Sequence, residues 1–190
     1  MLPESAAAAK VSRSELEPAM SAPARDYFAL FQLKPVFRID QAALTRAYHA
    51  LLDQFHPDRF AGKPQVEQRL AAQFCADVNS GFRVLSDDVS RAEYLLSRTP
   101  INLKEAEREG VGSEFLMTQI VLRERLESIQ PAEVEAREAL EQEINCHYAT
   151  AVEQFEAATS DENWQNAARH WQEMCYLSKL LEAARIGGGR

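Results

Sequence analysis

The stretch that decides the fold runs from Leu44 to Leu85 and reads LTRAYHALLDQFHPDRFAGKPQVEQRLAAQFCADVNSGFRVL. At its centre the tripeptide His56-Pro57-Asp58 forms the obvious break between two amphipathic helical patterns. A proline disfavours helical backbone at the residue before it and has no N–H for the helical ladder, so the first helix is predicted to end near Phe55. We therefore expect the tripeptide in a surface loop.

Apolar residues recur at helical spacing on both sides of this break. Before it, Arg46, His49 and Asp53 fall opposite the apolar stripe at about 100° per residue. A short loop between two such helices makes them antiparallel neighbours with facing stripes. The first stripe comprises Leu44, Tyr48, Leu51, Leu52 and Phe55, and the second comprises Val66, Leu70, Phe74, Val78, Phe82 and Leu85, widened by Ala71, Ala72 and Cys75.

A second helical block follows the break at residues 99–102, which read Thr-Pro-Ile-Asn. It contains three long helical patterns, over residues 113–129, 131–158 and 161–184. Pro131 suits the first turn of a helix, and Asp161 or Ser160 is a candidate cap for the last one. Only seven glycines and no sustained alternation of period two argue against a sheet. The sequence predicts an all-α protein whose second block is an antiparallel three-helix bundle.

The first block resembles a J-domain. The resemblance is carried by Asp26-Tyr27-Phe28-Ala29-Leu30-Phe31, by His56-Pro57-Asp58-Arg59-Phe60, and by Val78-Asn79-Ser80-Gly81-Phe82-Arg83-Val84-Leu85. Together with Arg91-Ala92-Glu93-Tyr94-Leu95-Leu96 and Phe115-Leu116-Met117, it narrows to the HscB family, the J-type co-chaperones of iron-sulfur cluster assembly. The resemblance covers roughly residues 26–184 and implies an N-terminal J-domain followed by a C-terminal bundle.

These patterns divide the chain as follows. Residues 1–25, rich in Ala, Ser and Pro, are expected to be a disordered extension, and 186–190 a flexible tail. The J-domain is expected over 26–98, a linker over 99–112, and the three-helix bundle over 113–185. No counterpart in the family suggests itself for residues 1–25.

Composition limits the function further. The chain has 190 residues, of which 46% are hydrophobic, and no apolar run approaches the roughly 18 residues of a membrane span. Its net charge of -8 argues against nucleic-acid binding, which needs clustered positive charge. Glu4, Glu15 and Glu17 speak against a mitochondrial presequence, and no secretory signal is evident, so a cytoplasmic location is expected.

Three cysteines, Cys75, Cys146 and Cys175, lie far apart with no CxxC pair. Their spacing indicates neither a disulfide framework nor a zinc site, and we expect reduced thiols and no metal or cofactor. The resemblance likewise implies that the partner scaffold, and not this chain, carries the iron-sulfur cluster.

For His56 and Asp58 the residues alone leave three alternatives open: a catalytic dyad, a metal site and a plain turn. A dyad needs a nucleophile or substrate within reach, and no Ser or Cys motif or phosphate-binding glycine loop accompanies it. His49 is an unpersuasive second metal ligand. The resemblance implies instead that the tripeptide docks on a DnaK-class chaperone of the HscA type and stimulates its ATPase. The cations expected to assist are Arg46, Arg59 and Lys63, although Asp53 weakens the basic face.

The helix predicted over residues 113–129 has apolar residues on two opposite faces. Phe115, Leu122, Leu126 and Ile129 cluster on one side, and Leu116, Met117, Ile120 and Val121 on the other. A bundle needs one apolar stripe, so the second set is covered either by interdomain packing or by a partner. The resemblance favours a partner: it implies that Leu116, Met117, Ile120, Val121, Glu124 and Tyr176 bind an IscU-type iron-sulfur scaffold protein. Val121 stands where the family often has glutamate, and Tyr176 where it has phenylalanine.

Two functions are consistent with these observations. The first is a non-enzymatic co-chaperone that delivers the scaffold protein to its chaperone. The alternative is a J-type co-chaperone with another client, whose bundle patch serves internal packing or self-association. A metal-dependent enzyme is a distant third.

Overall fold

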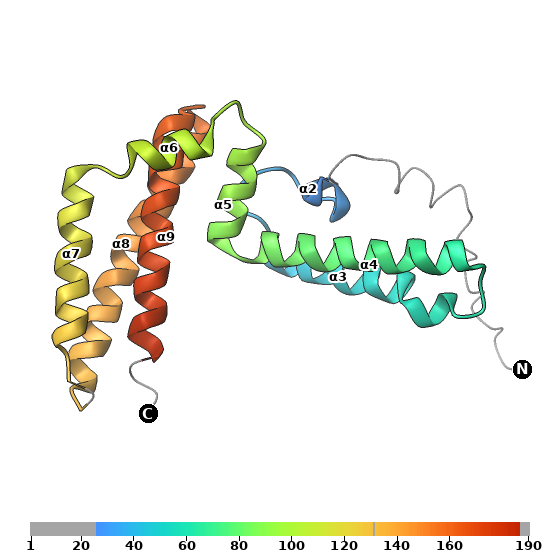
Figure 1. The fold of residues 1–190 in the computed structure, drawn as a ribbon, viewed down its shortest axis with the longest axis horizontal. Coiled ribbons are helices and arrows are strands. Elements are labelled where there is room, and N and C mark those ends of the chain that lie inside the picture. The colour runs from blue at the N-terminus through green and yellow to red at the C-terminus, as the bar shows by residue number, and fades with distance from the viewer. Residues whose placement is uncertain (1–25, 131, 187–190) are drawn as a thin grey trace, which may run out of the picture. The chain divides into compact units, whose positions relative to one another are not determined.

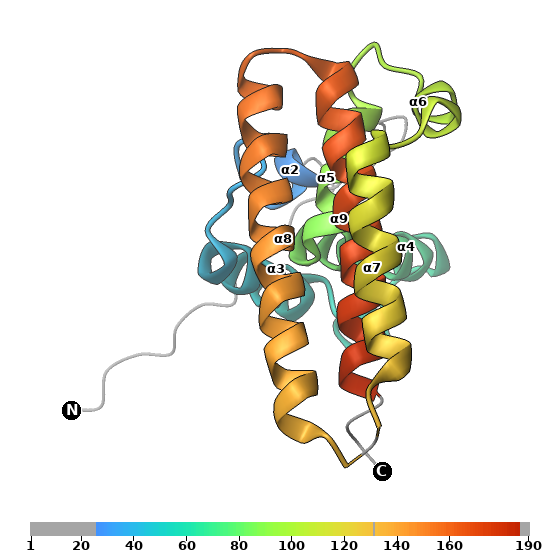
Figure 2. The same ribbon diagram turned by 90° about the vertical axis from the view of Figure 1, so that its left-hand side faces the viewer.

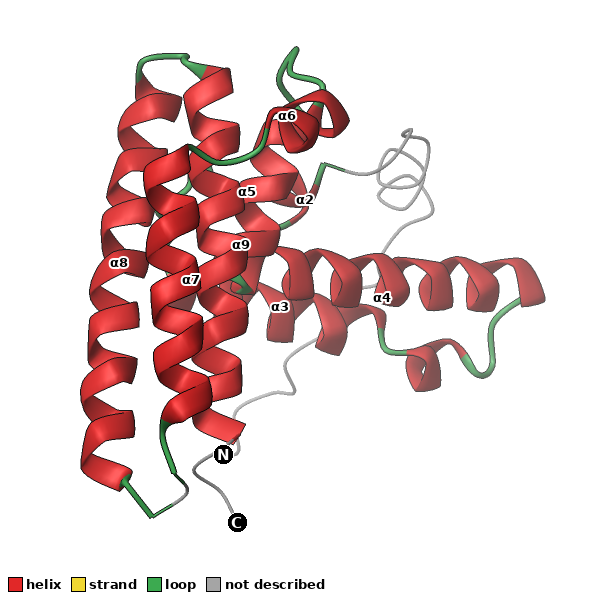
Figure 3. Ribbon diagram, turned by 60° about the vertical axis from the view of Figure 1, so that its left-hand side comes forward, coloured by secondary structure: helices red, strands yellow, loops and turns green. Residues whose placement is uncertain are grey.

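The computed structural model of the chain describes residues 26–130 and 132–186. All regular elements in these two ranges are helices, and no strand is drawn among them in Figure 3. The residues form two compact units. Unit 1 comprises the described residues up to Pro35 together with Ile39–Ser86, and unit 2 comprises Val36–Arg38 and the described residues from Asp87 onward. The expected N-terminal extension and residues 187–190 of the expected tail lie outside the described ranges.

Unit 1 is built on two long helices, α3 (Gln41–Phe55) and α4 (Gln65–Ser86), which lie side by side in Figure 1. Asp40 caps α3 by accepting a hydrogen bond from the amide of Ala43 at 2.9 Å. The facing stripes of the two helices form the core as the sequence predicts, with Leu44, Val78 and Leu85 fully buried. Between the helices lies one 3-10 turn, η1 (Pro57–Phe60).

A short helix, α2 (Tyr27–Leu30), packs on α4 at Gly81. A Cβ atom at position 81 would stand 2.8 Å from Cδ1 of Tyr27 and 3.0 Å from Cε2 of Phe31. Glycine is therefore required for this close approach, since real Cβ atoms do not come so near. Phe28 and Phe31 are buried against the helical pair as a result.

Unit 2 contains α5 (Asp88–Ser97), α6 (Leu103–Glu109), α7 (Ser113–Ser128), α8 (Val134–Ser160) and α9 (Trp164–Ile186). The last three lie along one another as the predicted bundle, which Figure 2 shows from the side. Its interior is a continuous apolar cluster in which Leu122, Ile144 and Met174 are almost completely buried. A helix cannot hide its apolar stripe alone, so the packing of these three stabilises each of them.

The division into units differs from the expected boundary at residue 98. Ala92 and Leu96 on α5 have no exposed surface and belong to the core cluster of unit 2, as does Phe37. The ring of Phe37 meets that of Phe155 on α8 edge to face, with centroids 5.0 Å apart. Apolar burial therefore draws α5 and the segment Val36–Arg38 into unit 2, and the compact division falls after Ser86.

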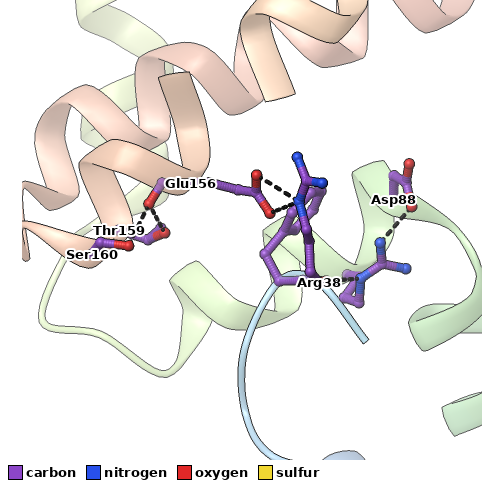
Figure 4. A network of polar contacts seen from close by, with 7 residues as sticks. Arg38, Asp88, Glu156, Thr159 and Ser160 are labelled. Atoms are coloured by element: carbon purple, nitrogen blue, oxygen red, sulfur yellow. Dashed lines mark hydrogen bonds and ion pairs between the residues drawn. The ribbon is translucent and has the colours of Figure 1, made fainter. Parts of the chain in front are cut away.

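Polar contacts also join the segment Val36–Arg38 to unit 2. Nε of Arg38 lies 2.6 and 2.8 Å from the two carboxylate oxygens of Glu156 on α8, as Figure 4 shows. The hydroxyls of Thr159 and Ser160 donate to the main-chain oxygen of Glu156 and hold the end of that helix. On α5, the guanidinium of Arg91 pairs with Asp88.

Several local predictions need correction. The expected linker over 99–112 contains one short helix, α6, which is capped by Asn102. The predicted caps Ser160 and Asp161 do not begin α9, since α8 runs on through Ser160 and the side chain of Asn163 caps α9 by accepting from the amide of Asn166. The described part of α8 begins at Val134, and Pro131 lies outside the described residues. Finally, Val66 is exposed and not part of the core stripe.

None of the helices in the described ranges is both long and apolar enough to cross a membrane.

Candidate functional site

Two surfaces carry the residues that the sequence singles out, one in each unit. The first is the loop between α3 and α4, residues 56–64, which we call the HPD loop. Helix α3 ends at Phe55 as predicted, and His56 adopts an extended backbone with φ -55° and ψ 133°, the conformation that a following proline favours. All three residues of the tripeptide are exposed to solvent.

The side chains of His56 and Asp58 face each other within the HPD loop. Nδ1 of His56 accepts a hydrogen bond from the main-chain N–H of Asp58 at 3.3 Å, and it lies 3.6 Å from the carboxylate oxygen Oδ2 of the same residue. The first contact requires an unprotonated Nδ1, whereas an ion pair with the carboxylate requires a protonated one. Both side chains are open to solvent, with 56% of the His56 side chain and 90% of the Asp58 side chain exposed.

The three predicted cations around this loop are all exposed but have different surroundings. The guanidinium of Arg59 donates to the main-chain oxygen of Asp53 at 2.9 Å, so one of its donors is already used within the loop. Arg46 on α3 lies 3.7 Å from Asp40, a loose exposed pair. The main-chain oxygen of Lys63 accepts from Nε2 of Gln68 at 2.8 Å, which ties the end of the loop to α4.

Within residues 26–130 and 132–186, no cluster of three or more His, Cys, Asp or Glu side chains is placed to hold a metal ion. The thiol of Cys75, near the start of the loop, is buried and donates a hydrogen bond to the main-chain oxygen of Phe55. The HPD loop itself presents exposed polar and charged side chains at one end of the pair formed by α3 and α4.

The second surface lies on α7 and α9, and we call it the α7 patch. It consists of five apolar or aromatic side chains that are each between 40% and 62% exposed, with the exposed carboxylate of Glu124 beside them; the five are Leu116, Met117, Ile120, Val121 and Tyr176. On the other side of the same helix Leu122 is 1% exposed, and Phe115, Leu126 and Ile129 are half-buried against the core. The two-faced character predicted for this helix is confirmed.

Tyr176 is the member of the patch that lies on α9, and it contacts the half-buried face of α7. Its ring lies beside that of Phe115, with centroids 6.3 Å apart. Charged pairs border the apolar centre: Arg125 reaches Glu143 on α8 at 2.6 Å, and Arg123 reaches Glu127 at 3.0 Å. Arg125 lowers the pKa of the Glu143 carboxyl by donating a hydrogen bond to it. An apolar centre with a charged rim is the usual composition of a protein-binding surface.

Two residues near the HPD loop have surroundings that periodicity did not indicate. Val66, predicted as core, is 66% exposed in the first turn of α4, close to the HPD loop in sequence. Gln68, two residues further along α4, donates to the main-chain oxygens of both Ala61 and Lys63. The polar residue at this position carried no sequence signal, because its contact depends on how the loop folds back.

Comparison with known proteins identifies the family. Residues 111–185 match the family model described as the HSCB C-terminal oligomerisation domain. The co-chaperone protein HscB homolog of Azoarcus sp. (strain BH72) is 37% identical over 158 residues, which cover 82% of this chain and 89% of that protein. The chain belongs to the HscB family of co-chaperones.

Solved structures of HscB proteins share the fold. Chaperone HscB from Vibrio cholerae superimposes with a TM-score of 0.75 at 30% identity, over 85% of this chain and 97% of that one. The human co-chaperone protein HscB gives a TM-score of 0.80 at 25% identity, over 87% and 83%. The predicted architecture, an all-α HscB fold with a J-domain and a helical C-terminal domain, is confirmed. A J-domain co-chaperone role in iron-sulfur cluster assembly follows from membership of the family.

Proposed function

We propose that this chain couples two partner proteins, using the HPD loop for one and the α7 patch for the other. The partner at the loop is a DnaK-class chaperone of the HscA type, and the partner at the patch is an IscU-type scaffold that carries the iron-sulfur cluster. The observation that supports this most is the α7 patch itself. Four apolar side chains stay exposed on the side of α7 opposite its core face, with Tyr176 exposed on α9, and water-exposed apolar groups so grouped favour a bound protein.

At the HPD loop, His56, Pro57 and Asp58 contact the chaperone, and Arg46, Arg59 and Lys63 add attraction to an acidic surface. This chain accelerates ATP hydrolysis by binding the hydrolysis-competent state of the chaperone more tightly than its other states, since only differential affinity shifts an equilibrium. The exposure of the tripeptide and its place on a fixed helical pair support this assignment. Docking is weak and sensitive to salt, because these cations are few and exposed.

At the α7 patch, Leu116, Met117, Ile120 and Val121 form the apolar centre, Tyr176 extends it, and Glu124 sets the orientation of the scaffold. Burying exposed apolar surface contributes about 25 cal/mol for each Å² removed from water. The scaffold that binds here presents a matching apolar surface. The chain breaks no bonds of its own in this scheme, in keeping with relatives that are named co-chaperones.

The deciding experiment measures steady-state ATPase turnover of an HscA-type chaperone with this protein, with an IscU-type scaffold, and with both. The expected result is stimulation by this protein that becomes more than additive when the scaffold is added. His56→Gln should remove the stimulation while the variant still binds the scaffold in a pull-down. Undiminished stimulation by His56→Gln would remove the tripeptide from the mechanism, and purely additive rates would refute the coupling.

Self-association through the α7 patch is the second candidate, favoured by the description of the matching family model as an oligomerisation domain. Sedimentation velocity of the protein alone over a range of concentrations tests it. A dimer that dissociates when Met117 is replaced by glutamate, with no scaffold bound by the wild type, would favour this candidate over scaffold delivery.

The location we propose is the cytoplasm. The three cysteines are unpaired thiols, as expected in a reducing compartment. Fractionation of cells with an antibody against the chain tests this placement.

A further inference from the structure

The HPD break leaves carbonyl groups in the last turn of α3 without their usual helical donors, among them those of Asp53 and Phe55. In a continuing helix the oxygen of Asp53 accepts from the amide of residue 57, but proline at that position has no N–H. The oxygen of Phe55 would accept from the amide of Arg59, which instead donates to the oxygen of His56 at 3.0 Å within η1. Phe55 immediately precedes the tripeptide, and Asp53 lies three residues before it.

Side chains donate hydrogen bonds to the oxygens of both Asp53 and Phe55. The guanidinium of Arg59 donates to the oxygen of Asp53 at 2.9 Å. The thiol of Cys75, on α4, lies 3.1 Å from the oxygen of Phe55, which is the last residue of α3. The first contact comes from within the loop and is exposed, whereas the second joins the end of α3 to the neighbouring helix in the core.

The surroundings of Cys75 make this second contact specific. The thiol is 8% exposed, and the ring of Phe55 packs on that of Phe74 with centroids 4.3 Å apart. Burial raises the pKa of the Cys75 thiol, so the group keeps the hydrogen that it needs in order to donate. A water molecule has little access to replace it at this buried position, so loss of the donor leaves the carbonyl unsatisfied.

We propose that Cys75 is a positioning residue for the HPD loop: its thiol fixes the carbonyl of Phe55 and thereby the direction in which the backbone leaves α3 into His56, Pro57 and Asp58. This inference rests on the proposed docking of the loop to the chaperone. Without the hydrogen bond, the loop populates additional conformations. The chaperone then binds a smaller competent fraction, which weakens apparent affinity without changing the reaction in the bound complex.

Three variants separate the hydrogen bond from packing. Cys75→Val keeps a similar volume but has no donor, Cys75→Ser keeps a donor, and Cys75→Ala serves if valine prevents folding. Each is compared with the wild-type chain in ATPase stimulation of an HscA-type chaperone and, without the chaperone, in hydrogen exchange of the amides of residues 58–61.

We expect Cys75→Val and Cys75→Ala to raise the concentration of this protein needed for half-maximal stimulation by about threefold to tenfold, because the loss of one buried hydrogen bond corresponds to a factor of about that size. Maximal stimulation should be unchanged. Exchange at residues 58–61 should accelerate by a similar factor, and Cys75→Ser should stay within about twofold of the wild type in both readouts. If Cys75→Ser behaves like Cys75→Val, or if exchange in the loop is unchanged in every variant, the proposal is wrong. If the wild type fails to stimulate, the proposed function is wrong, and the exchange data still decide whether Cys75 positions the loop.

Discussion

The guanidinium of Arg91 donates a hydrogen bond from Nε to the main-chain oxygen of Phe37 at 2.7 Å, and its carbon lies 4.8 Å from the centroid of the Phe37 ring. Arg91 is 4% exposed on α5 and pairs with Asp88 on the same helix. One buried side chain thus holds α5 and the segment Val36–Arg38 together by a charge-assisted hydrogen bond and a cation–π contact. Consequently the region that resembles a J-domain shares its last helix with the core of unit 2.

Replacing Arg91 by glutamine should therefore destabilise unit 2. The buried oxygen of Phe37 loses its donor, which costs about 1–3 kcal/mol. Both tryptophans of the chain, Trp164 and Trp171, lie on α9, so urea unfolding followed by tryptophan fluorescence reports on this unit. Arg108→Gln, at an exposed position on α6, is the matched control and should stay within about 0.5 kcal/mol of the wild type. Equal effects of the two substitutions would mean that the Arg91 contacts contribute no stability.

Replacing Leu116, Met117 and Ile120 together by glutamine should abolish scaffold binding and leave the melting temperature nearly unchanged. Glutamine matches leucine and methionine in helix propensity, and the three side chains are substantially exposed, so little core packing is lost. Isothermal titration calorimetry with an IscU-type scaffold and thermal unfolding measure the two quantities.

The matched control is Leu122→Ala on the opposite face of α7. This side chain is buried, so its truncation should cost about 2–5 kcal/mol while folded protein still binds the scaffold. A triple variant that melts as early as Leu122→Ala would show that the patch is part of the core.

Much of the fold follows from the sequence because helix period and proline chemistry are local. Pro57 ends α3 at Phe55 whatever else the chain does. The start of α9 was not predictable in the same way, because Ser160, Asp161 and Asn163 are all good caps. Helix α8 continues through Ser160, and Glu162 adopts a positive φ of 55° in the turn that follows. Asn163 is then the residue that caps α9. Tertiary packing, which sets how long α8 is, makes that choice.

The same distinction applies to the candidate surfaces. The exposed face of α7 was predictable, because a helix with apolar residues on two opposite sides cannot bury both in one bundle. The exposure of Val66 was not, since periodicity does not tell where the neighbouring helix ends. The contact between Cys75 and Phe55 joins residues 20 apart in the chain and depends on how closely two helices approach. The spacing of the cysteines in the sequence does not predict this contact.

Alanine at Gly81 should destabilise unit 1. Its Cβ would stand 2.8 Å from the ring of Tyr27, so α2 must move away from α4 at a cost of about 1–3 kcal/mol. The helix propensity gained on replacing glycine, about 1 kcal/mol, offsets only part of this. Hydrogen exchange at the amides of α2 should accelerate.

Gly62→Ala is the control for this substitution. Nothing lies within 4 Å of a Cβ at position 62, so the change should be neutral or slightly stabilising. Faster exchange in α2 from Gly62→Ala, or none from Gly81→Ala, would contradict the close approach at Gly81.

The three thiols should react with iodoacetamide in a fixed order at pH 8. Burial raises the pKa of Cys175 to about 11 and also raises that of Cys75, so at pH 8 both groups are almost entirely in the unreactive protonated form. Cys146 is exposed on α8 and should be alkylated first. Peptide mass spectrometry over time gives the three alkylation rates.

Raising the pH from 8 toward 10 should speed the alkylation of Cys175, because its thiolate fraction grows about tenfold for each pH unit below its pKa. Alkylated Cys146 should leave chaperone stimulation intact, since it lies in unit 2 and outside both surfaces. Early labelling of Cys75 in the folded protein would show that the core beside the HPD loop opens to solvent.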